Sequence, residues 1–332
     1  MTEVGHLETR LGILQPLIGD EATIEIAINA DGRVWVERAG DSAMSPSDVT
    51  LSPLAVKDLA GLIANKQRLT LTDSQPAIST TVEVTGAALR CQAIIPPASA
   101  GGTTITFRVF RRRPAGEAPK HFRFLRDQTV SLEAERLELL RRVRDMAMHG
   151  ANPDEFLRAC IQARMNIVIS GGTSSGKTEL ARRLLWMVEE WHRLVLIEDS
   201  AELLPAQENA VSLIAERVET SARSADKLLE MTLRLRPDRI ILGELRGVEA
   251  MTFLEAINTG HEGSFTTLHA TTARKAVNRL AFLVMRAGMP LTLTEIRDYV
   301  RESIDVIVQT GRVGKERGIL ETYFPALDGE SG

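Results

Sequence analysis

One continuous segment of the sequence has the residue types and spacing of a phosphate-binding loop. It reads Gly171-Gly172-Thr173-Ser174-Ser175-Gly176-Lys177-Thr178, a glycine, four residues, then glycine, lysine and a hydroxyl residue. Glycines there let backbone N–H groups curl around a β-phosphate at the start of a helix, whose dipole favours anions. Lys177 is expected to reach the β- and γ-oxygens, and the Thr178 hydroxyl is expected to bind Mg²⁺. The segment therefore predicts binding of a nucleoside triphosphate.

Carboxylates follow two other apolar runs of the sequence. Glu198, Asp199 and Glu202 come after one run, and Glu244 comes after another with a glycine between. At the carboxyl edge of a sheet, where open α/β sheets place their ligands, such groups suit metal organisation or water activation. Because no aspartate precedes Glu244, it is expected to act on Mg²⁺ through water or on the attacking water itself. Two alternatives stay open: the first group can be a helix-capping cluster, and Glu244 an incidental exposed residue of a buried strand.

Two histidines flank a further apolar run. His261 and His269 are eight residues apart, and no third metal ligand lies near them in the sequence. A zinc site is therefore not expected. Either histidine is a candidate for sensing a γ-phosphate or for hydrogen bonding between elements, and a purely structural role stays equally open.

The order of elements around these residues predicts how they are positioned. Short apolar runs alternate with helical stretches from residue 166 onward, at 167–169, 194–197, 240–242 and 265–268. This order is typical of a mainly parallel sheet covered by helices on both faces. Two helices are expected before it, one over 132–148 and one capped by Asn152-Pro153, and a hairpin of 304–308 with 318–323 is expected after it.

Residues 1–110 predict a smaller α+β domain. Alternating apolar residues over 24–28 and 34–36 flank a turn at Asp31-Gly32, and Ser52-Pro53 is expected to begin a helix. Further strands are expected to begin at Val82 and to cover 105–109. Residues 111–130 combine arginine, proline and glycine and are interpreted as a linker to a nucleotide-binding domain over 131–332. The arginines at 111–113 are either a solvated connector or part of a subunit contact.

Composition limits the classes of protein to which the chain can belong. Its 332 residues are 44% hydrophobic and 25% charged, with a formal net charge of -4 and two cysteines. These values exclude a polybasic nucleic-acid binder, a disulfide framework and a four-cysteine zinc module. Neither a bilayer-spanning apolar run nor a signal-peptide pattern is found. A cytoplasmic location is therefore expected, with membrane association only through partners.

Taken in order, four segments resemble those of the secretion-superfamily traffic ATPases, the hexameric motors of type II secretion, type IV pili and type IV secretion. They are the phosphate loop, an acidic box at 197–203, Gly243-Glu244 as an atypical Walker B end, and a histidine box from His261 to His269. The segments 90–97 and 102–108 are similar to the N-terminal domain of the type IV secretion and conjugal-transfer branch. The lack of a tetracysteine zinc module also favours this branch.

This resemblance implies an α/β fold, a RecA-like P-loop ATPase core with a smaller N-terminal α+β domain. It further implies a homohexameric ring at the cytoplasmic face of the inner membrane, powering pilus biogenesis or substrate translocation with inner-membrane and cytoplasmic components of the apparatus. Glu202 is then the first candidate for the water-activating carboxylate, Glu198 a second, and Glu244 the Walker-B acid. Arg90 and Arg108 match arginines that approach the nucleotide and stabilise charge on the γ-phosphoryl group. Ordinary strand-edge salt bridges are the alternative for these two arginines.

Glu179 departs from the family pattern, which more often has a second Thr or Ser there. Phosphates repel a carboxylate, so Glu179 is expected to point away and to reduce nucleotide affinity. Two other functions remain: a nucleotide-gated assembly scaffold with little turnover, and a DNA-dependent RecA-like ATPase. With 4% aromatic residues and an acidic balance, direct nucleic-acid binding is not expected.

Overall fold

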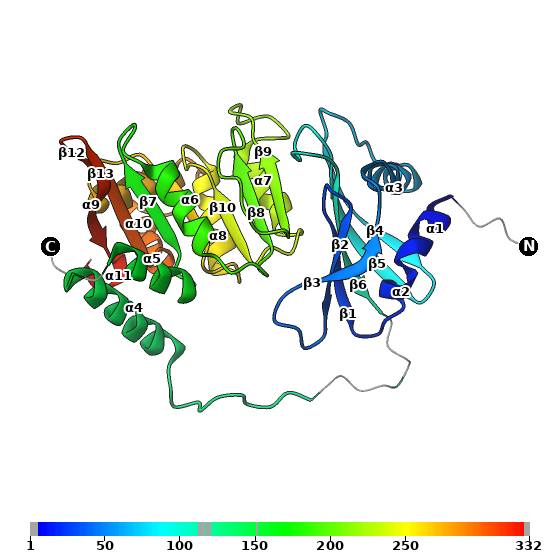
Figure 1. The fold of residues 1–332 in the computed structure, drawn as a ribbon, viewed down its shortest axis with the longest axis horizontal. Coiled ribbons are helices and arrows are strands. Elements are labelled where there is room, and N and C mark those ends of the chain that lie inside the picture. Colours follow the sequence, from blue (N-terminus) through cyan, green and yellow to red (C-terminus); the bar gives the residue numbers. More distant parts are fainter. Residues whose placement is uncertain (1–5, 112–115, 117–120, 151, 329–332) are drawn as a thin grey trace, which may run out of the picture. The chain divides into compact units, whose positions relative to one another are not determined.

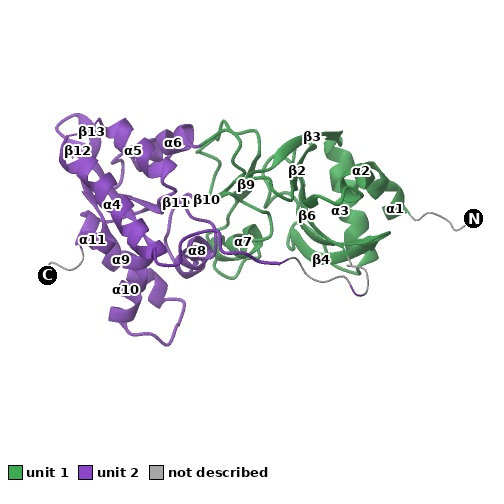
Figure 2. Cartoon of the chain, turned by 90° about the horizontal axis from the view of Figure 1, so that it is seen from below, with its two compact units in different colours: residues 1–112, 189–241 green, residues 113–188, 242–332 purple. Residues whose placement is uncertain are grey.

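The computed structural model describes residues 6–111, 116, 121–150 and 152–328. These residues divide into two compact units, each made of two separate stretches of chain (Figure 2). The first unit comprises Met1–Arg112 and Glu189–Ile241, and the second Arg113–Val188 and Leu242–Gly332. The domain limits expected from the sequence stay a prediction. Among the described residues no helix is both long and apolar enough to cross a membrane.

A six-stranded antiparallel sheet forms the N-terminal part of the first unit (Figure 1). Its order is β3-β2-β1-β6-β5-β4. The strands are β1 (Thr23–Ile28), β2 (Arg33–Arg38), β3 (Ser45–Thr50), β4 (Ala77–Val84), β5 (Ala87–Ile94) and β6 (Thr104–Phe110). The helices α1 (His6–Leu11), η1 (Gly12–Leu14), α2 (Gln15–Ile18) and α3 (Pro53–Lys66) cover one face and share its apolar core.

Local sequence signals explain several of these elements. Gly32 has φ +86°, and a Cβ there would lie 1.7 Å from the Leu51 carbonyl oxygen, so the expected β1–β2 turn requires glycine. The Ser52 side chain accepts the Ala55 N–H at 3.2 Å and begins α3, as expected. The expectation that a strand begins at Val82 is wrong, because β4 begins at Ala77 and ends at Val84. The polar residues in the first half of β4 are exposed or half-buried, so this half lacks the apolar alternation that indicates a strand.

The second stretch of the first unit contains parallel strands. β8 (Leu194–Glu198) pairs in parallel with β9 (Ala210–Ile214), and the order is β10-β8-β9, with α7 (Ala225–Thr232) between β9 and β10 (Arg239–Leu242) in the chain. Backbone hydrogen bonds join this stretch to the N-terminal one. The Ala100 N–H donates to Ser212 O at 2.9 Å and the Ile214 N–H to Ala98 O at 2.8 Å.

The second unit contains strands in the order β13-β12-β7-β11. β7 (Ile167–Gly171) pairs in parallel with both β11 (Phe265–Leu268) and β12 (Val306–Val313), and β12 pairs antiparallel with β13 (Glu316–Tyr323). The helices are α4 (Leu132–Met148), α5 (Pro153–Gln162), α6 (Lys177–Met187), α8 (Glu249–Asn258), α9 (Ala273–Met285), α10 (Leu293–Ser303) and α11 (Pro325–Asp328). The expected helices at 132–148 and after Asn152, and the C-terminal hairpin, are confirmed.

Candidate active site

The phosphate-loop segment joins the end of β7 to the start of α6. Ser174 and Gly176 take positive φ values of 58° and 100°, which turn the backbone sharply between the two elements. No side chain caps α6, so its first N–H groups are not satisfied by a capping residue. An uncapped helix start after a strand is a ready site for a phosphate group.

Gly171 is required by the close approach of β12. A Cβ at this position would lie 2.3 Å from Ser175 Oγ and 2.8 Å from the Thr310 carbonyl oxygen. Ser175 Oγ and Thr310 Oγ1 are hydrogen-bonded at 2.8 Å, and Thr310 Oγ1 donates to Ser170 O at 3.1 Å. The loop is thus held against β12 by a hydroxyl pair that leaves no space for a side chain.

We expect Gly171→Ala to weaken ATP binding about tenfold or more, since overpacking costs about 1–3 kcal/mol. Fluorescent-nucleotide titration would measure this, with Gly318→Ala in β13, where a Cβ meets nothing within 4 Å, as the matched control. Equal affinity of the Gly171→Ala variant and the wild type would contradict the steric account.

Lys177 is held at the loop by carbonyl oxygens. Its Nζ donates to Gly171 O at 3.1 Å and Gly172 O at 2.9 Å, and lies 3.3 Å from His269 Nδ1. Burial lowers the pKa of the Lys177 ammonium, and the charge of Glu244 opposes this shift. The ammonium therefore uses neutral acceptors that phosphate oxygens can replace.

Glu244 lies beside Lys177 and is positioned by β11. Its carboxylate is 3.0 Å from His269 Nε2 and accepts the Arg246 Nε–H at 2.8 Å. Thr267 holds the backbone on both sides, since its Oγ1 donates to Gly243 O at 2.7 Å and its carbonyl accepts the Leu245 N–H at 2.9 Å. Because His269 Nδ1 faces an ammonium, we assign it as the acceptor and Nε2–H as the donor to Glu244. The structure thus brings Lys177, His269 and Glu244 together.

His261 does not join this group. It precedes β11, whereas His269 follows it, so the two residues stand at opposite ends of the strand. The His261 Nδ1 bonds to Ala256 O at 3.0 Å, and its carbonyl accepts from Ser264 Oγ at 2.7 Å. The structure places His261 away from the phosphate loop of its own unit, in contacts that fasten the α8–β11 connection.

The carboxylates of the acidic box lie in the first unit. Glu198 is 7% exposed, and its Oε1 accepts the N–H groups of Glu202 at 3.0 Å and Leu203 at 3.1 Å. Asp199 pairs with Arg217 at 2.9 Å. Glu202 is exposed, and its Oε1 lies 3.5 Å from Ser200 Oγ. No helix begins at this box, so the N–H groups that Glu198 accepts belong to the loop after β8 and helix capping does not describe them. Glu202 presents its side chain to solvent.

Arg90 and Arg108 are neighbours on the first unit's sheet. They are paired across β5 and β6, and both guanidinium groups lie over the Phe110 ring, at 5.4 Å and 5.8 Å. Arg108 Nε is also 3.6 Å from a Glu25 carboxylate oxygen. The strand-edge salt bridge that was the alternative for these arginines is thus present as one long contact, at Arg108.

The comparisons with known proteins decide the family. The profile of the family described as "Type II/IV secretion system protein" matches residues 125–312, more than half of the chain. The chain belongs to this family.

Its relatives belong to the type IV secretion and conjugal-transfer branch of this family. The conjugal transfer protein TrbB of Rhizobium radiobacter is 36% identical over 322 residues, covering 96% of this chain and 88% of the relative. The type IV secretion system protein VirB11 of Bartonella quintana is 32% identical, covering 95% and 92%. The crystal structure of the VirB11 ATPase of the Brucella suis type IV secretion system, in complex with sulphate, is 30% identical, covers 96% and 94%, and has a TM-score of 0.81.

The resemblance seen in the sequence is therefore confirmed. This secretion-family chain is a P-loop ATPase of the type IV secretion and conjugal-transfer branch, with a RecA-like core. Its departure at Glu179 is accommodated, because that side chain is 82% exposed and pairs with Arg182 at 3.6 Å. The reduced nucleotide affinity expected from Glu179 stays a prediction.

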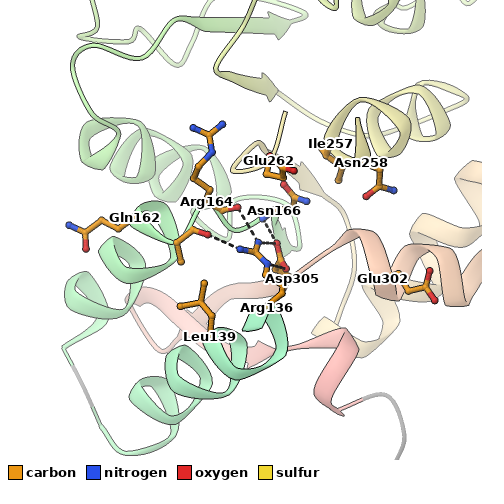
Figure 3. A pocket seen from close by; sticks show the side chains of 11 residues that line it. Arg136, Leu139, Gln162, Arg164, Asn166, Ile257, Asn258, Glu262, Glu302 and Asp305 are labelled. Atoms are coloured by element: carbon orange, nitrogen blue, oxygen red, sulfur yellow. Dashed lines mark hydrogen bonds and ion pairs between the residues drawn. The ribbon is translucent and has the colours of Figure 1, made fainter. Parts of the chain in front are cut away.

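A hollow of about 590 Å³ lies at the amino ends of β7 and β12, the strand ends opposite the phosphate loop. Figure 3 shows Arg136 of α4 bonded there to Asp305, at 2.5 Å and 3.1 Å. Arg136 also donates to Ala163 O and Arg164 O, and the Asn166 N–H donates to Asp305 at 2.7 Å. Burial raises the pKa of Asp305, and the Arg136 charge opposes this. The network fastens α4 to the start of β12.

Sequence reasoning about this ATPase missed Arg246, Phe110 and Glu25. Arg246 stands two residues after Glu244, so a bond between them was readable from the spacing. Phe110 and Glu25 gave no such signal, because their contacts are with residues of other strands.

The arginine at 111 was assigned to the linker, but its guanidinium donates to the carbonyls of Ile18, Asp20 and Thr23 in the first unit. Positions 112 and 113 lie outside the described residues.

Proposed function

We propose that this chain is the ATP-hydrolysing motor of a type IV secretion or conjugal transfer apparatus, powering pilus biogenesis or substrate translocation as a homohexameric ring. The observation that carries the proposal is the cluster of Lys177, His269 and Glu244 at the uncapped start of α6. A cation, a histidine and a carboxylate at a phosphate loop suit hydrolysis of a triphosphate rather than phosphate storage alone.

The donor set fits ATP with Mg²⁺. The Lys177 ammonium and the N–H groups at the start of α6 would bind the phosphates. The Thr178 hydroxyl and the Glu244 carboxylate would supply oxygen ligands, which Mg²⁺ prefers. When bound, Mg²⁺ neutralises charge on the β- and γ-oxygens. Residues 171–176 wrap the phosphates, and Lys177 exchanges its carbonyl acceptors for phosphate oxygens. His269 keeps the Glu244 carboxylate in place through its Nε2–H.

The proposal also gives roles in hydrolysis to one carboxylate and two arginines of the first unit. Glu202 is the candidate for activating the attacking water, since its carboxylate is exposed, whereas one oxygen of Glu198 is already used by two N–H groups. Arg90 and Arg108 supply positive charge to the γ-phosphoryl group, whichever copy of the chain provides them. His261 is not included among the nucleotide-binding residues, because its contacts are with Ala256 and Ser264.

The relatives' names support the cellular setting. The two relatives named above, which match most of this chain, are a conjugal transfer protein and a type IV secretion system protein. We infer that the motor works at the cytoplasmic face of the inner membrane, attached through inner-membrane and cytoplasmic components of the apparatus and not through nucleic acid.

The test is ATP hydrolysis per protomer as a function of protein concentration, with and without Mg²⁺, for the wild type and Glu244→Gln. We expect specific activity to rise with concentration and the variant to lose about 10²–10³-fold in turnover, since a group acting on the reacting atoms is removed. Glu255→Gln, an exposed glutamate on α8, is the matched control and should behave as wild type.

Two other outcomes would contradict parts of the proposal. Activity that depends on Glu244 but not on concentration would contradict a site completed by neighbouring subunits. Nucleotide binding without turnover would favour the assembly scaffold, and stimulation by DNA that weakens with salt would favour a DNA-dependent motor.

A further inference from the structure

A row of charged side chains crosses the six-stranded sheet of the first unit. Glu25 on β1 is paired with Glu37 on β2 and with Arg108 on β6, and Arg108 is paired with Arg90 on β5. Residues directly opposite each other on neighbouring strands point to the same face of a sheet. The four side chains therefore form one line, on the face opposite to the core shared with α1–α3.

The row continues beyond the sheet into the second stretch of the unit. Glu37 accepts two hydrogen bonds from Arg236, at 2.7 Å and 3.0 Å, and Arg236 also pairs with Asp238. Asp238 in turn accepts the backbone N–H of Arg193 at 2.7 Å. Arg193 immediately precedes β8, and Asp238 immediately precedes β10. This chain of charged residues thus connects Arg90 and Arg108 on the sheet to the starts of β8 and β10.

Glu25 lies between Glu37 and Arg108 in this row. Its side chain is 10% exposed, and its cation contact to Arg108 Nε is long, at 3.6 Å. Burial raises the pKa of Glu25 to about 7, with Glu37 adding to the rise and Arg108, Arg236 and Arg193 opposing it. The ionised carboxylate is therefore maintained at a cost, and only near or above neutral pH.

Arg108 makes two contacts with its own sheet. Its Nε is 3.6 Å from a Glu25 carboxylate oxygen, and its guanidinium lies over the Phe110 ring, as that of Arg90 does. Within the described part of the chain, the terminal nitrogens of Arg108 have no hydrogen-bond acceptor. An arginine that faces a carboxylate with its Nε leaves its two terminal amino groups as a fork that fits a phosphate.

We propose that Glu25 is a positioning residue that aims Arg108, and Arg90 through the shared Phe110 ring, at the nucleotide. This rests on the proposed function, in which these two arginines supply charge to the triphosphate. The ionised carboxylate orients Arg108, and loss of its charge releases the guanidinium while leaving the sheet intact.

The test is steady-state ATPase kinetics of Glu25→Gln between pH 6 and pH 9. We expect kcat at pH 8 to fall about tenfold with KM nearly unchanged, because misplacement of a group that acts in the transition state costs about 10–10²-fold. Glu25 is ionised above its pKa and protonated below it. The wild-type kcat should therefore fall as pH drops through about 7, and this limb should be absent in Glu25→Gln.

Stability separates positioning from a merely structural role. Since burial disfavours the charged form, the neutral isostere should melt at the same or a higher temperature than the wild type at pH 8. Glu83→Gln, an exposed glutamate on β4 of the same sheet, is the matched control and should match the wild type in every measurement.

Arg108→Ala separates this inference from the proposed function. If Arg108→Ala keeps full activity, the nucleotide role of the arginine is wrong. If Arg108→Ala loses activity while Glu25→Gln keeps the wild-type kcat and pH profile, the positioning role of Glu25 is overturned and the proposed function stands. A loss of kcat in Glu25→Gln accompanied by a lower melting temperature would also overturn the positioning role.

Discussion

Replacing Lys177 with methionine should lower kcat/KM for ATP hydrolysis by about 10²–10³-fold, the usual cost of removing one preorganised donor from a transition state. The hydrogen-bond partners of the ammonium are two neutral carbonyls of its own loop and His269 Nδ1 at 3.3 Å, which phosphate oxygens can replace. Methionine keeps most of the length of the unbranched side chain and removes the charge. Single-turnover hydrolysis with ATP would measure the effect.

Two features make the Lys177 result interpretable. The uncapped N–H groups of α6 remain in the variant, so weak nucleotide binding should survive although turnover does not. Lys275→Met, which removes an exposed lysine of α9, is the matched control and should hydrolyse ATP at the wild-type rate. Turnover of Lys177→Met within a factor of a few of the wild type would contradict the site.

Arg193→Met should destabilise the first unit by about 3 kcal/mol or more. The guanidinium is fully buried, donates to Leu235 O at 2.7 Å and to Asn29 Oδ1 at 2.8 Å, and also bonds Asn209. Burial lowers the pKa of Arg193 to about 10, which is still well above neutral pH, so the guanidinium stays charged. Its hydrogen bonds stabilise this buried charge. Removing it leaves several buried acceptors unsatisfied, each costing about 1–3 kcal/mol.

Hydrogen exchange would locate the Arg193 effect. The amides of Ala100 and Ile214 bond across the two stretches of the first unit and should exchange faster in the variant, while amides between β4 and β5 should not change. Arg10→Met removes an exposed arginine that is 3.4 Å from Asp58, and should cost less than about 1 kcal/mol. Unchanged exchange at Ala100 and Ile214 would show that Arg193 does not hold the two stretches together.

Features made of consecutive residues could be predicted from the sequence. The phosphate loop follows a strand and begins a helix as expected, and the helix Leu132–Met148 begins after Ser131, whose side chain accepts the Ala134 N–H at 3.3 Å. The expected parallel strands after residue 166 are also confirmed, because a short apolar run bounded by helices is a strong local signal.

Strands with weak local signals were missed. β3 (Ser45–Thr50) alternates half-buried and exposed residues and contains proline, and β9 (Ala210–Ile214) buries only alternate residues beside β8. Each is an edge strand of its sheet and is stabilised by pairing with one neighbour, β3 with β2 and β9 with β8. Propensity alone does not identify such strands, since strand stability depends on cross-strand packing.

The sequence by itself determined the phosphate loop, the strand and helix that flank it and the family, since each depends on residues that are neighbours in the chain. Only the tertiary structure decided which side chains meet. Parallel pairing of β7 with β11 brings His269 to Lys177 and leaves His261 at the other end of the strand. Antiparallel register places Glu25 between Glu37 and Arg108. The physical reason is that pairing register and burial, which set these distances and the charge of Glu25, arise from residues far apart in the sequence.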